Sequence, residues 1–429
     1  MDAYSETLYR IYNLRGGVID LRLDRMDLAL ALFGHPEKQF PSFHIAGTNG
    51  KGSTAAMIHR ILSLAGYRTA LYTSPHLVCF TERIRVGDVE ISPEEVVELA
   101  EEVRDRTAAA TVPLTFFEFV TVMGFVHFAR QKVDVAVVEV GLGGRLDATN
   151  LVKPLVSVIT TISKDHEAYL GSDLLSIARE KGGIIKPGVP LVAGALPKEA
   201  VNLFNDLARE RRAPAYFLGQ DYRIFLKNAG LFDYTGVKEN FEMLSVALRG
   251  RHQRSNAAVA LASLETARET FPVSEEVLRE GLRTVKWPGR FEIMLESPTV
   301  ILDGAHNGEG VKALVEAVQE YYGARKVKLL FASMEDKDWR LMLGLLAGVA
   351  NEAVLTRVEM ERSADPRQLA SYLTDRGVPH RVIEDSRFAL RSLLDGVRPD
   401  EIVLVAGSLY LLGEIRPAVE EIASQNRPA

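Results

Sequence analysis

Short apolar runs alternate along the chain with longer segments in which apolar residues recur every three or four positions. The short runs are typical of buried strands, and the longer segments are typical of amphipathic helices. Because the two kinds of segment alternate, they predict α/β layers around a mainly parallel sheet. In the first half of the chain, strands are expected at 43–47, 69–73, 134–140, 155–162 and 190–193, and helices at 53–66, 92–106, 116–131, 173–182 and 198–211.

The pattern changes in the middle of the chain. Segments 222–227 and 241–248 predict a small β-rich insertion, and the Pro-Gly pair within 286–290 is suited to a linker. A second α/β run follows, so we predict a first domain at 1–290 and a smaller, Rossmann-like domain at 291–429. Before the linker, helices are expected at 254–269 and 275–285. In the second run, helices are expected at 308–322, 338–347, 366–375 and 386–395, and strands at 291–296, 299–303, 327–332, 352–357 and 401–406.

Composition narrows the class of protein. The chain has 429 residues, of which 47% are apolar and 25% charged, which suits two domains of ordinary globular composition. The net charge of −6 argues against a general nucleic-acid-binding surface, and the single cysteine, Cys79, excludes an intramolecular disulfide and a cysteine-based zinc site. We find no apolar run of membrane-spanning length and no signal-peptide pattern, so we expect a cytoplasmic protein with no nucleic-acid or membrane partner.

The segment 46–54, AGTNGKGST, is the strongest chemical signal in the chain. It follows an apolar run and precedes helical spacing, and a glycine-rich turn between a strand and a helix can cradle phosphates with its backbone N–H groups. Lys51 can place an ammonium on the terminal phosphates, and Ser53 can place a hydroxyl on Mg²⁺. The spacing departs from the standard motif, since Ile45 replaces its first glycine and Gly52 separates Lys51 from Ser53. An ordinary glycine turn is the alternative.

Polar residues follow two of the predicted strands. Glu139 lies near the end of the apolar run 134–140, and ligands of open α/β sheets bind beyond the carboxyl ends of strands. A carboxylate there, near a phosphate loop, is a candidate Mg²⁺ ligand. His166 follows the strand at 155–162, and an imidazole ligand would also suit Mn²⁺. The alternatives are an ion-paired or solvent-facing Glu139 and a structural His166.

Two further segments are less decisive by themselves. Lys181 lies at a predicted helix end before two glycines, where a lysine also interacts favourably with the helix dipole, and spacing does not separate a chemical role from this one. Asp303 and His306 follow the strand at 299–303, and the neighbouring Asn307 could simply cap the next helix.

Taken together, these segments resemble the folylpolyglutamate synthase and dihydrofolate synthase family of the Mur ligase superfamily, and within it the bifunctional bacterial type. The resemblance covers nearly the whole chain, in the family's order. It is carried by the loop 47–53, TSPHL at 73–77, TERIRV at 81–86, TFFE at 115–118, VEVGLGGRLDATN at 138–150, Asp165–His166, Leu170–Gly171, Glu180–Lys181, Asn256, PGRF at 288–291 and DGAHN at 303–307.

The resemblance implies a role for each matching position. ATP would be bound by Asn49, Gly50, Lys51, Gly52, Ser53, Asn256, Arg290 and Asp303. One or two Mg²⁺ ions, for which Mn²⁺ can substitute, would be bound by Ser53, Glu139 and His166. The pteroate or folate substrate would contact Arg83, Thr115, Phe116, Phe117, Glu118, Leu146, Asp147 and Ala148. Lys51, Lys181 and His306 would be catalytic, and Lys181 matches a lysine that is carbamylated in the family.

Carbamylation would explain why a lysine, Lys181, lies near a cationic metal site. A CO₂ adduct turns a cation into an oxygen-donor anion that can bind or orient a metal. The sequence departs from the family in two places: Gly182 stands where the family commonly has alanine, and Gly308 stands where it commonly has proline. Neither departure removes a functional group.

The family implies a P-loop ATPase domain at 1–290 that also holds the folate pocket, and a domain at 291–429 that closes over ATP and binds glutamate. The implied reaction is ATP-dependent addition of L-glutamate to dihydropteroate and to the γ-carboxyl of tetrahydrofolates through an acyl phosphate, by a monomer. The alternatives are a folylpolyglutamate synthase alone, a Mur-type cell-wall ligase, and a nucleotide-driven switch. Cell-wall ligases usually have a further N-terminal domain for their substrate, and only about forty residues precede the phosphate loop here, which disfavours them. A nucleotide-driven switch would not require Lys181.

Overall fold

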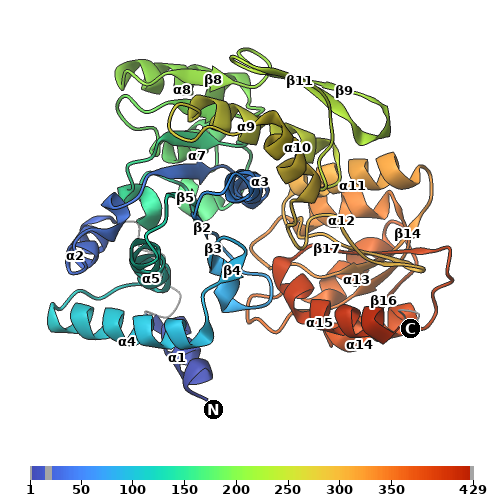
Figure 1. Cartoon of the computed structure of the whole chain (residues 1–429). Helices are drawn as coiled ribbons and strands as arrows, with labels where there is room; N and C mark the ends of the chain where they lie inside the picture. The colour runs from blue at the N-terminus through green and yellow to red at the C-terminus, as the bar shows by residue number, and fades with distance from the viewer. Residues whose placement is uncertain (1, 15–21, 426–429) are drawn as a thin grey trace. The chain divides into compact units, whose positions relative to one another are not determined.

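The computed structural model describes residues 2–14 and 22–425. Residues 1, 15–21 and 426–429, which the predicted domain ranges include, lie outside the described residues. The chain divides into two compact units, the first formed by Met1–Ala247 with Arg254–Val285 and the second by Leu248–Gln253 with Lys286–Ala429. Each unit has its own sheet flanked by helices (Figure 1), which confirms the α/β class predicted from the sequence.

The first unit is built on an eight-stranded sheet in the order β4-β3-β2-β5-β1-β6-β7-β8. The six strands from β2 to β8 run parallel, and β3 and β4 add an antiparallel edge. The central strands are buried throughout because helices cover both faces, as parallel sheets require. The strands are β1 (Ser42–Ala46), β2 (Thr69–Tyr72), β3 (Ile84–Val86), β4 (Val89–Glu90), β5 (Val135–Glu139), β6 (Val156–Ile159), β7 (Leu191–Ala193) and β8 (Ala215–Phe217).

Local sequence fixes where several helices of this part begin. Ser92 and Thr115 each cap the helix that follows, and a glutamate three residues later bonds back to the cap, which is the capping-box arrangement. The helices are α1 (Ala3–Tyr12), α2 (Asp24–Ala31), α3 (Lys51–Leu64), α4 (Pro93–Ala109), α5 (Phe116–Arg130), α6 (Glu167–Leu170), α7 (Leu174–Gly182), α8 (Lys198–Glu210), α9 (Arg251–Thr266) and α10 (Glu275–Thr284). Short 3₁₀ turns lie at Pro36–Lys38, Phe80–Arg83, Ala148–Leu151 and Asn228–Gly230.

The predicted β-rich insertion is present as a three-stranded antiparallel sheet. It consists of β9 (Arg223–Leu226), β10 (Phe232–Thr235) and β11 (Asn240–Leu244), in the order β11-β10-β9. The sequence pattern indicated the two outer strands and missed the middle one.

The second unit has a six-stranded sheet in the order β12-β13-β17-β14-β15-β16. β12 pairs antiparallel with β13, and the other pairs are parallel. Its strands are β12 (Glu292–Glu296), β13 (Thr299–Leu302), β14 (Val327–Phe331), β15 (Ala350–Leu355), β16 (His380–Val382) and β17 (Ile402–Ala406). Its helices are α11 (Gly308–Tyr322), α12 (Trp339–Ala347), α13 (Pro366–Thr374), α14 (Ser386–Leu394) and α15 (Leu409–Gln425).

Among the predicted element ends that differ from the structure, two concern the phosphate loop. The strand expected at 155–162 ends at Ile159, because Thr160 and Thr161 bond to the loop with their side chains rather than extending the sheet. The helix expected from residue 53 begins at Lys51, with Gly50 at its N-cap in a left-handed conformation. In the part of the chain that the structure describes, we find no helix long and apolar enough to cross a membrane.

Candidate active site

The phosphate loop joins β1 to α3 in the centre of the first sheet. Gly47 has a φ of +149° and Gly50 a φ of +85°, so both lie where glycine is favoured. A Cβ on Gly47 would lie 1.9 Å from Thr160 Oγ1, and one on Gly50 would lie 2.4 Å from Asn256 Oδ1. The glycines therefore allow close approach, and Asn256, a predicted ATP contact, lies directly against the loop.

The loop is fixed to the residues that follow β6. Thr48 N donates to Thr161 O at 2.9 Å, and Thr48 Oγ1 donates to Ser163 O at 3.1 Å. Asn49 N donates to Thr161 Oγ1 at 2.9 Å, and Asn49 O accepts from Thr160 Oγ1 at 2.6 Å. Sequence reasoning missed this clamp, although three hydroxyl residues at a strand end were a usable signal. Because the clamped segment leads to His166, it also ties that residue's loop to the phosphate loop.

Lys51 and Lys181 meet at one backbone carbonyl. Gly47 O accepts from Lys51 Nζ at 3.1 Å and from Lys181 Nζ at 3.0 Å. The Lys181 side chain is only 5% exposed. Burial, followed by the positive charge of Lys51, lowers the pKa of Lys181 to about 7. At neutral pH a substantial fraction of such a lysine is the uncharged amine, which is a nucleophile, whereas an ordinary lysine is almost entirely ammonium.

Three oxygen and nitrogen donors form the candidate metal site. Glu139, 5% exposed, ends β5 beside Ile45 of β1, and its Oε2 accepts from Ser74 N at 3.3 Å. Ser53 is buried in the first turn of α3, and His166 is exposed at the start of α6. A hydroxyl, a carboxylate and an imidazole together suit Mg²⁺ or Mn²⁺. Within residues 2–14 and 22–425 we find no cluster of three or more His, Cys, Asp or Glu that could hold a metal.

An aromatic cluster surrounds Arg83 and Phe116, two of the predicted folate contacts. The Arg83 guanidinium carbon lies 5.3 Å from the Phe116 ring centroid, and Tyr12 stacks on the same ring at 5.4 Å. Arg83 Nε donates to His76 Nδ1 at 2.8 Å. Burial, followed by the Arg83 charge, lowers the pKa of His76 to about 4, so the imidazole stays neutral and can accept this bond. Tyr12 and His76 had no role in the sequence prediction, and their contacts with Phe116 and Arg83 add them to this cluster.

Phe117 and Glu118 lie in the first turn of α5, and both side chains contact other residues of this chain. A Cβ on Gly141 would lie 2.4 Å from the Phe117 ring, so this ring packs directly on the loop after β5. Glu118 Oε1 accepts from Arg25 at 2.9 Å, and Oε2 accepts from the backbone and hydroxyl of Thr115, both at 2.8 Å. Thr115 and Glu118 thus shape the helix start.

Asp147 also makes its contacts within the chain. Leu142 N donates to its Oδ2 at 2.9 Å, and the backbone and hydroxyl of Thr149 donate to its Oδ1 at 3.0 and 2.5 Å. Burial raises the pKa of Asp147, and these hydrogen bonds oppose the rise. Leu146 beside it is half-buried and Ala148 is buried. Direct contact of these three residues with a substrate stays a prediction.

In the second unit, Arg290, Asp303 and His306 gather where β13 ends. Asp303 accepts from Phe291 N and Ala305 N, both at 2.8 Å. Burial raises the pKa of Asp303, and the Arg290 charge opposes the rise. His306 Nδ1 lies 2.8 Å from Gly304 O, which holds its ring over the turn.

The helix cap expected next to His306 is present. Asn307 Oδ1 accepts from Gly310 N at 2.8 Å and caps α11.

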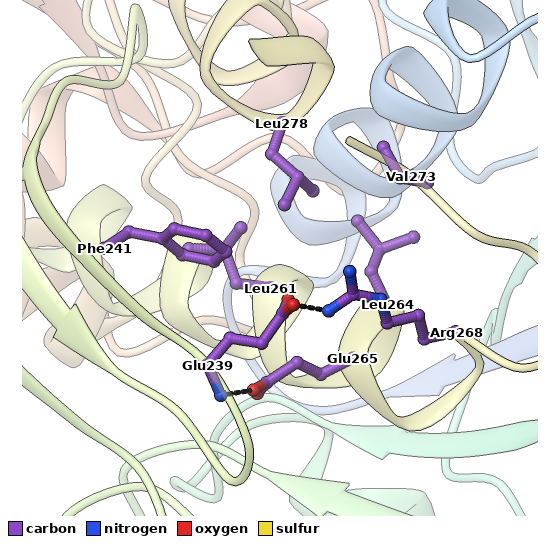
Figure 2. Close-up of a pocket in the computed structure, with 8 residues that line it drawn as sticks. All are labelled: Glu239, Phe241, Leu261, Leu264, Glu265, Arg268, Val273 and Leu278. Carbon is purple, nitrogen blue, oxygen red and sulfur yellow. Dashed lines mark hydrogen bonds and ion pairs between the residues drawn. The ribbon is translucent and has the colours of Figure 1, made fainter. Parts of the chain in front are cut away.

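Figure 2 shows a separate pocket beneath the three-stranded sheet. One of its two acidic side chains, Glu265, is buried and accepts hydrogen bonds from Tyr234, Val237, Lys238 and Glu239. Four donors satisfy this carboxylate, so it holds the β10–β11 turn to α9. None of the predicted site residues lines this pocket, which is formed by Glu239, Phe241, Leu261, Leu264, Glu265, Arg268, Val273 and Leu278.

The close approach at Gly47 gives a first prediction. In the variant Gly47→Ala, the new methyl group would collide with Thr160, so we expect binding of ADP, measured by calorimetry, to weaken by about tenfold, or ~1.4 kcal/mol. Gly66→Ala is the matched control, since Gly66 also has a positive φ, +92°, but its Cβ would meet nothing within 4 Å. Equal ADP affinity of Gly47→Ala and the native chain would contradict the loop's role.

Comparison with known proteins identifies the family. One family profile, the Mur ligase middle domain, matches residues 45–264, and another, the glutamate ligase domain of Mur ligases, matches 289–409. The dihydrofolate synthase/folylpolyglutamate synthase of Bacillus subtilis is 36% identical over 407 residues, covering 92% of this chain and 94% of that protein. The chain belongs to the dihydrofolate synthase/folylpolyglutamate synthase family. The resemblance predicted from its sequence is confirmed.

Solved structures of this family agree with the fold over nearly its full length. Escherichia coli FolC in complex with DHPP and ADP superposes with a TM-score of 0.90 at 32% identity, covering 99% of this chain and 98% of that one. The bifunctional folylpolyglutamate synthase/dihydrofolate synthase of Yersinia pestis complexed with AMPPNP and Mn ion has a TM-score of 0.88 at 33% identity, covering 98% of each chain. Both are nucleotide complexes of family members.

Proposed function

We propose that this chain is an ATP-dependent ligase that adds L-glutamate to dihydropteroate and to the γ-carboxyl of tetrahydrofolates. The observation that carries the proposal is the meeting of Lys51 and the buried Lys181 on the Gly47 carbonyl. A phosphate loop alone would serve any nucleotide hydrolase. A second, buried lysine beside the loop, with its pKa lowered to about 7, matches the lysine that is carbamylated in this family. The 36% identity with a folate synthase over 92% of the chain favours this reading over a cell-wall ligase.

The chemistry explains why ATP is needed. A carboxylate is a poor acyl donor, so its oxygen first takes the γ-phosphoryl group from ATP, which releases ADP and leaves an acyl phosphate. The amine of glutamate then attacks the carbonyl carbon, the bond to the phosphate oxygen breaks, and an amide and phosphate form as the amine loses a proton. Lys51 offsets charge on the transferred group, and bound Mg²⁺ would neutralise further phosphate charge.

Ser53, Glu139 and His166 are the proposed ligands of one or two Mg²⁺ ions, with Mn²⁺ as a substitute. We also propose that Lys181 is carbamylated. Its uncharged Nζ would form a bond to the carbon of CO₂ and lose a proton, which yields a carbamate anion. The low pKa of Lys181 supports this step, because only the uncharged amine reacts.

The remaining assignments are proposals for the substrates. Phe116, Phe117 and Arg83 present ring faces and a cation suited to a flat, anionic folate. Asn256, Arg290 and Asp303 are the proposed ATP contacts beyond the phosphate loop, and His306 is proposed as a catalytic neighbour of Asp303. A monomeric state and a cytoplasmic location stay predictions.

An acid-quench assay tests the reaction directly. With dihydropteroate, ATP and Mg²⁺ present, we expect ADP and phosphate to form in step with a product one glutamate heavier, and tetrahydrofolate should behave likewise. ATP turnover at full rate without glutamate would refute the ligase assignment. Glutamate addition to tetrahydrofolate but not to dihydropteroate would instead support a folylpolyglutamate synthase alone.

A further inference from the structure

A buried histidine, His44, lies in β1, separated from the phosphate-loop segment 46–54 only by Ile45. An apolar side chain would be expected at this position in the core of the sheet. His44 is in the middle of β1, beside Val138 of β5 and Ser157 of β6, and is 0% exposed. Burial lowers its pKa to about 3, so the imidazole is neutral. Burying a polar ring in a sheet core costs stability, so this histidine needs a reason beyond packing.

The hydrogen bonds of His44 define its tautomer. Its Nε2 lies 2.8 Å from Thr149 Oγ1, and that hydroxyl lies 2.5 Å from Asp147 Oδ1. An ionised carboxylate only accepts, so the single Thr149 proton must point to Asp147. The Thr149 oxygen then accepts from His44, which places the imidazole proton on Nε2. Among the described residues no acceptor for a proton on His44 Nδ1 is found, which agrees with the proton being on Nε2.

The far end of this chain of hydrogen bonds lies beside the candidate site. Asp147 Oδ2 accepts from Leu142 N at 2.9 Å and so fixes the backbone directly after β5. That backbone follows Glu139, and Gly141, the second residue after the strand, packs against the Phe117 ring. Its position therefore affects both the proposed metal ligand and the proposed folate pocket.

We propose that His44 is a positioning residue for the ligase reaction: through Thr149 it orients Asp147, which holds Gly141–Leu142 between Glu139 and Phe117. This inference rests on the proposed function. His44 touches no reacting group, and its effect passes through two side chains to a backbone segment. The relay gives this sheet-core histidine a role, because a leucine there could not donate to Thr149.

Kinetics separate this role from ordinary packing. In His44→Leu we expect kcat/KM for dihydropteroate to fall on the order of tenfold, since small displacements of positioning groups are costly in catalysis. The KM for ATP should stay within about twofold, because Thr160 and Thr161 hold the phosphate loop independently. His44→Gln, whose amide nitrogen can replace Nε2 as a donor, should recover most of the loss.

His59→Leu is the matched control. His59 is also buried and neutral, with its pKa lowered to about 4 chiefly by burial, and its Nε2 has no partner found among the described residues. It lies in α3, and among the described residues we find no hydrogen bond from it to Thr149, Asp147 or Leu142. This variant should leave both kinetic constants unchanged, and an equal loss in His59→Leu and His44→Leu would overturn the proposal.

Two measurements test the relay without activity. In ¹⁵N spectra of histidine-labelled native chain, we expect the His44 proton on Nε2 with no titration between pH 5 and 8, and a proton on Nδ1 would overturn the proposal. Amide exchange at Leu142 should become faster in His44→Leu but not in His59→Leu, and unchanged exchange would also overturn it. If the native chain fails to ligate glutamate, the proposed function fails, while these two readouts still decide the relay.

Discussion

Replacing Lys181 with methionine should remove ligase activity and, at the same time, stabilise the folded chain at pH 7. The first effect follows from the position of Nζ on the phosphate loop, and we expect kcat to fall on the order of 10²–10³-fold. The second follows from burial, since a shift of the Lys181 pKa from 10.5 to about 7 means that folding disfavours its charged form. Each pKa unit corresponds to about 1.4 kcal/mol.

The net gain in stability should be smaller than the whole shift. Methionine loses the hydrogen bond to Gly47 O, so we expect the free energy of unfolding to rise by roughly 1–3 kcal/mol at pH 7. Buffer depleted of CO₂ keeps the native lysine unmodified, and thermal unfolding of the two chains then gives the difference.

The stabilisation should depend on pH in a defined direction. Between pH 7 and 10.5 the folded native chain has released the Lys181 proton while the unfolded chain still binds it, so native stability rises with pH across this window. Below pH 7 both the folded and the unfolded chain bind the proton, so burying the charged Lys181 destabilises the native fold by its full amount. The advantage of Lys181→Met over the native chain should therefore shrink from pH 7 to 9.5.

Lys186→Met is the control for burying a lysine in general. Burial, followed by the charge of Arg211, lowers the pKa of Lys186 to about 8, but its Nζ donates to Asn150 O rather than to the phosphate loop. This variant should keep its activity. Full activity in Lys181→Met would contradict the role of this lysine, and an advantage that grows with pH would contradict its uncharged state.

Breaking the buried ion pair between Arg25 and Glu118 should produce the largest loss of stability. The two groups lie 2.9 Å apart, with side chains only 7% and 4% exposed. Arg25→Met leaves the Glu118 charge buried without its cation, which costs roughly 3–5 kcal/mol in comparable pairs. We expect the first thermal unfolding transition to fall by about 10 °C.

A second substitution identifies the cause. Glutamine in place of Glu118 removes the charge but keeps the capping box with Thr115, so Arg25→Met/Glu118→Gln should recover much of the lost stability. Arg10→Met is the exposed control: its partner Glu6 is 54% exposed, and loss of that pair should cost less than about 1 kcal/mol. If the double variant were as unstable as Arg25→Met, the cause would be lost packing rather than an unpaired charge.

Much of the architecture could be predicted from the sequence because the patterns that indicate strands and helices lie within short segments of the chain. The strands β1, β5 and β6 are continuous apolar runs, and α4 and α5 carry their own capping boxes within four residues. The elements that sequence reasoning missed have weaker local signals. β4 is two residues long, and the strands β3, β8 and β16 span three residues each, too short to show a period. The helices α1, α2, α6 and α15 were also missed.

By itself, the sequence determined the α/β class, the phosphate loop and the family. The first two depend on residues close together in the chain, and the family is indicated by a series of such short motifs in a fixed order. Only the tertiary structure decided that Lys181 reaches Gly47 across 134 positions, that Arg25 pairs with Glu118, and that His44 bonds to Thr149. The physical reason is the strand order β5-β1-β6, which places chain segments from over 90 residues away on either side of the phosphate loop. The pattern of apolar residues within one strand does not indicate which other strands will pair with it.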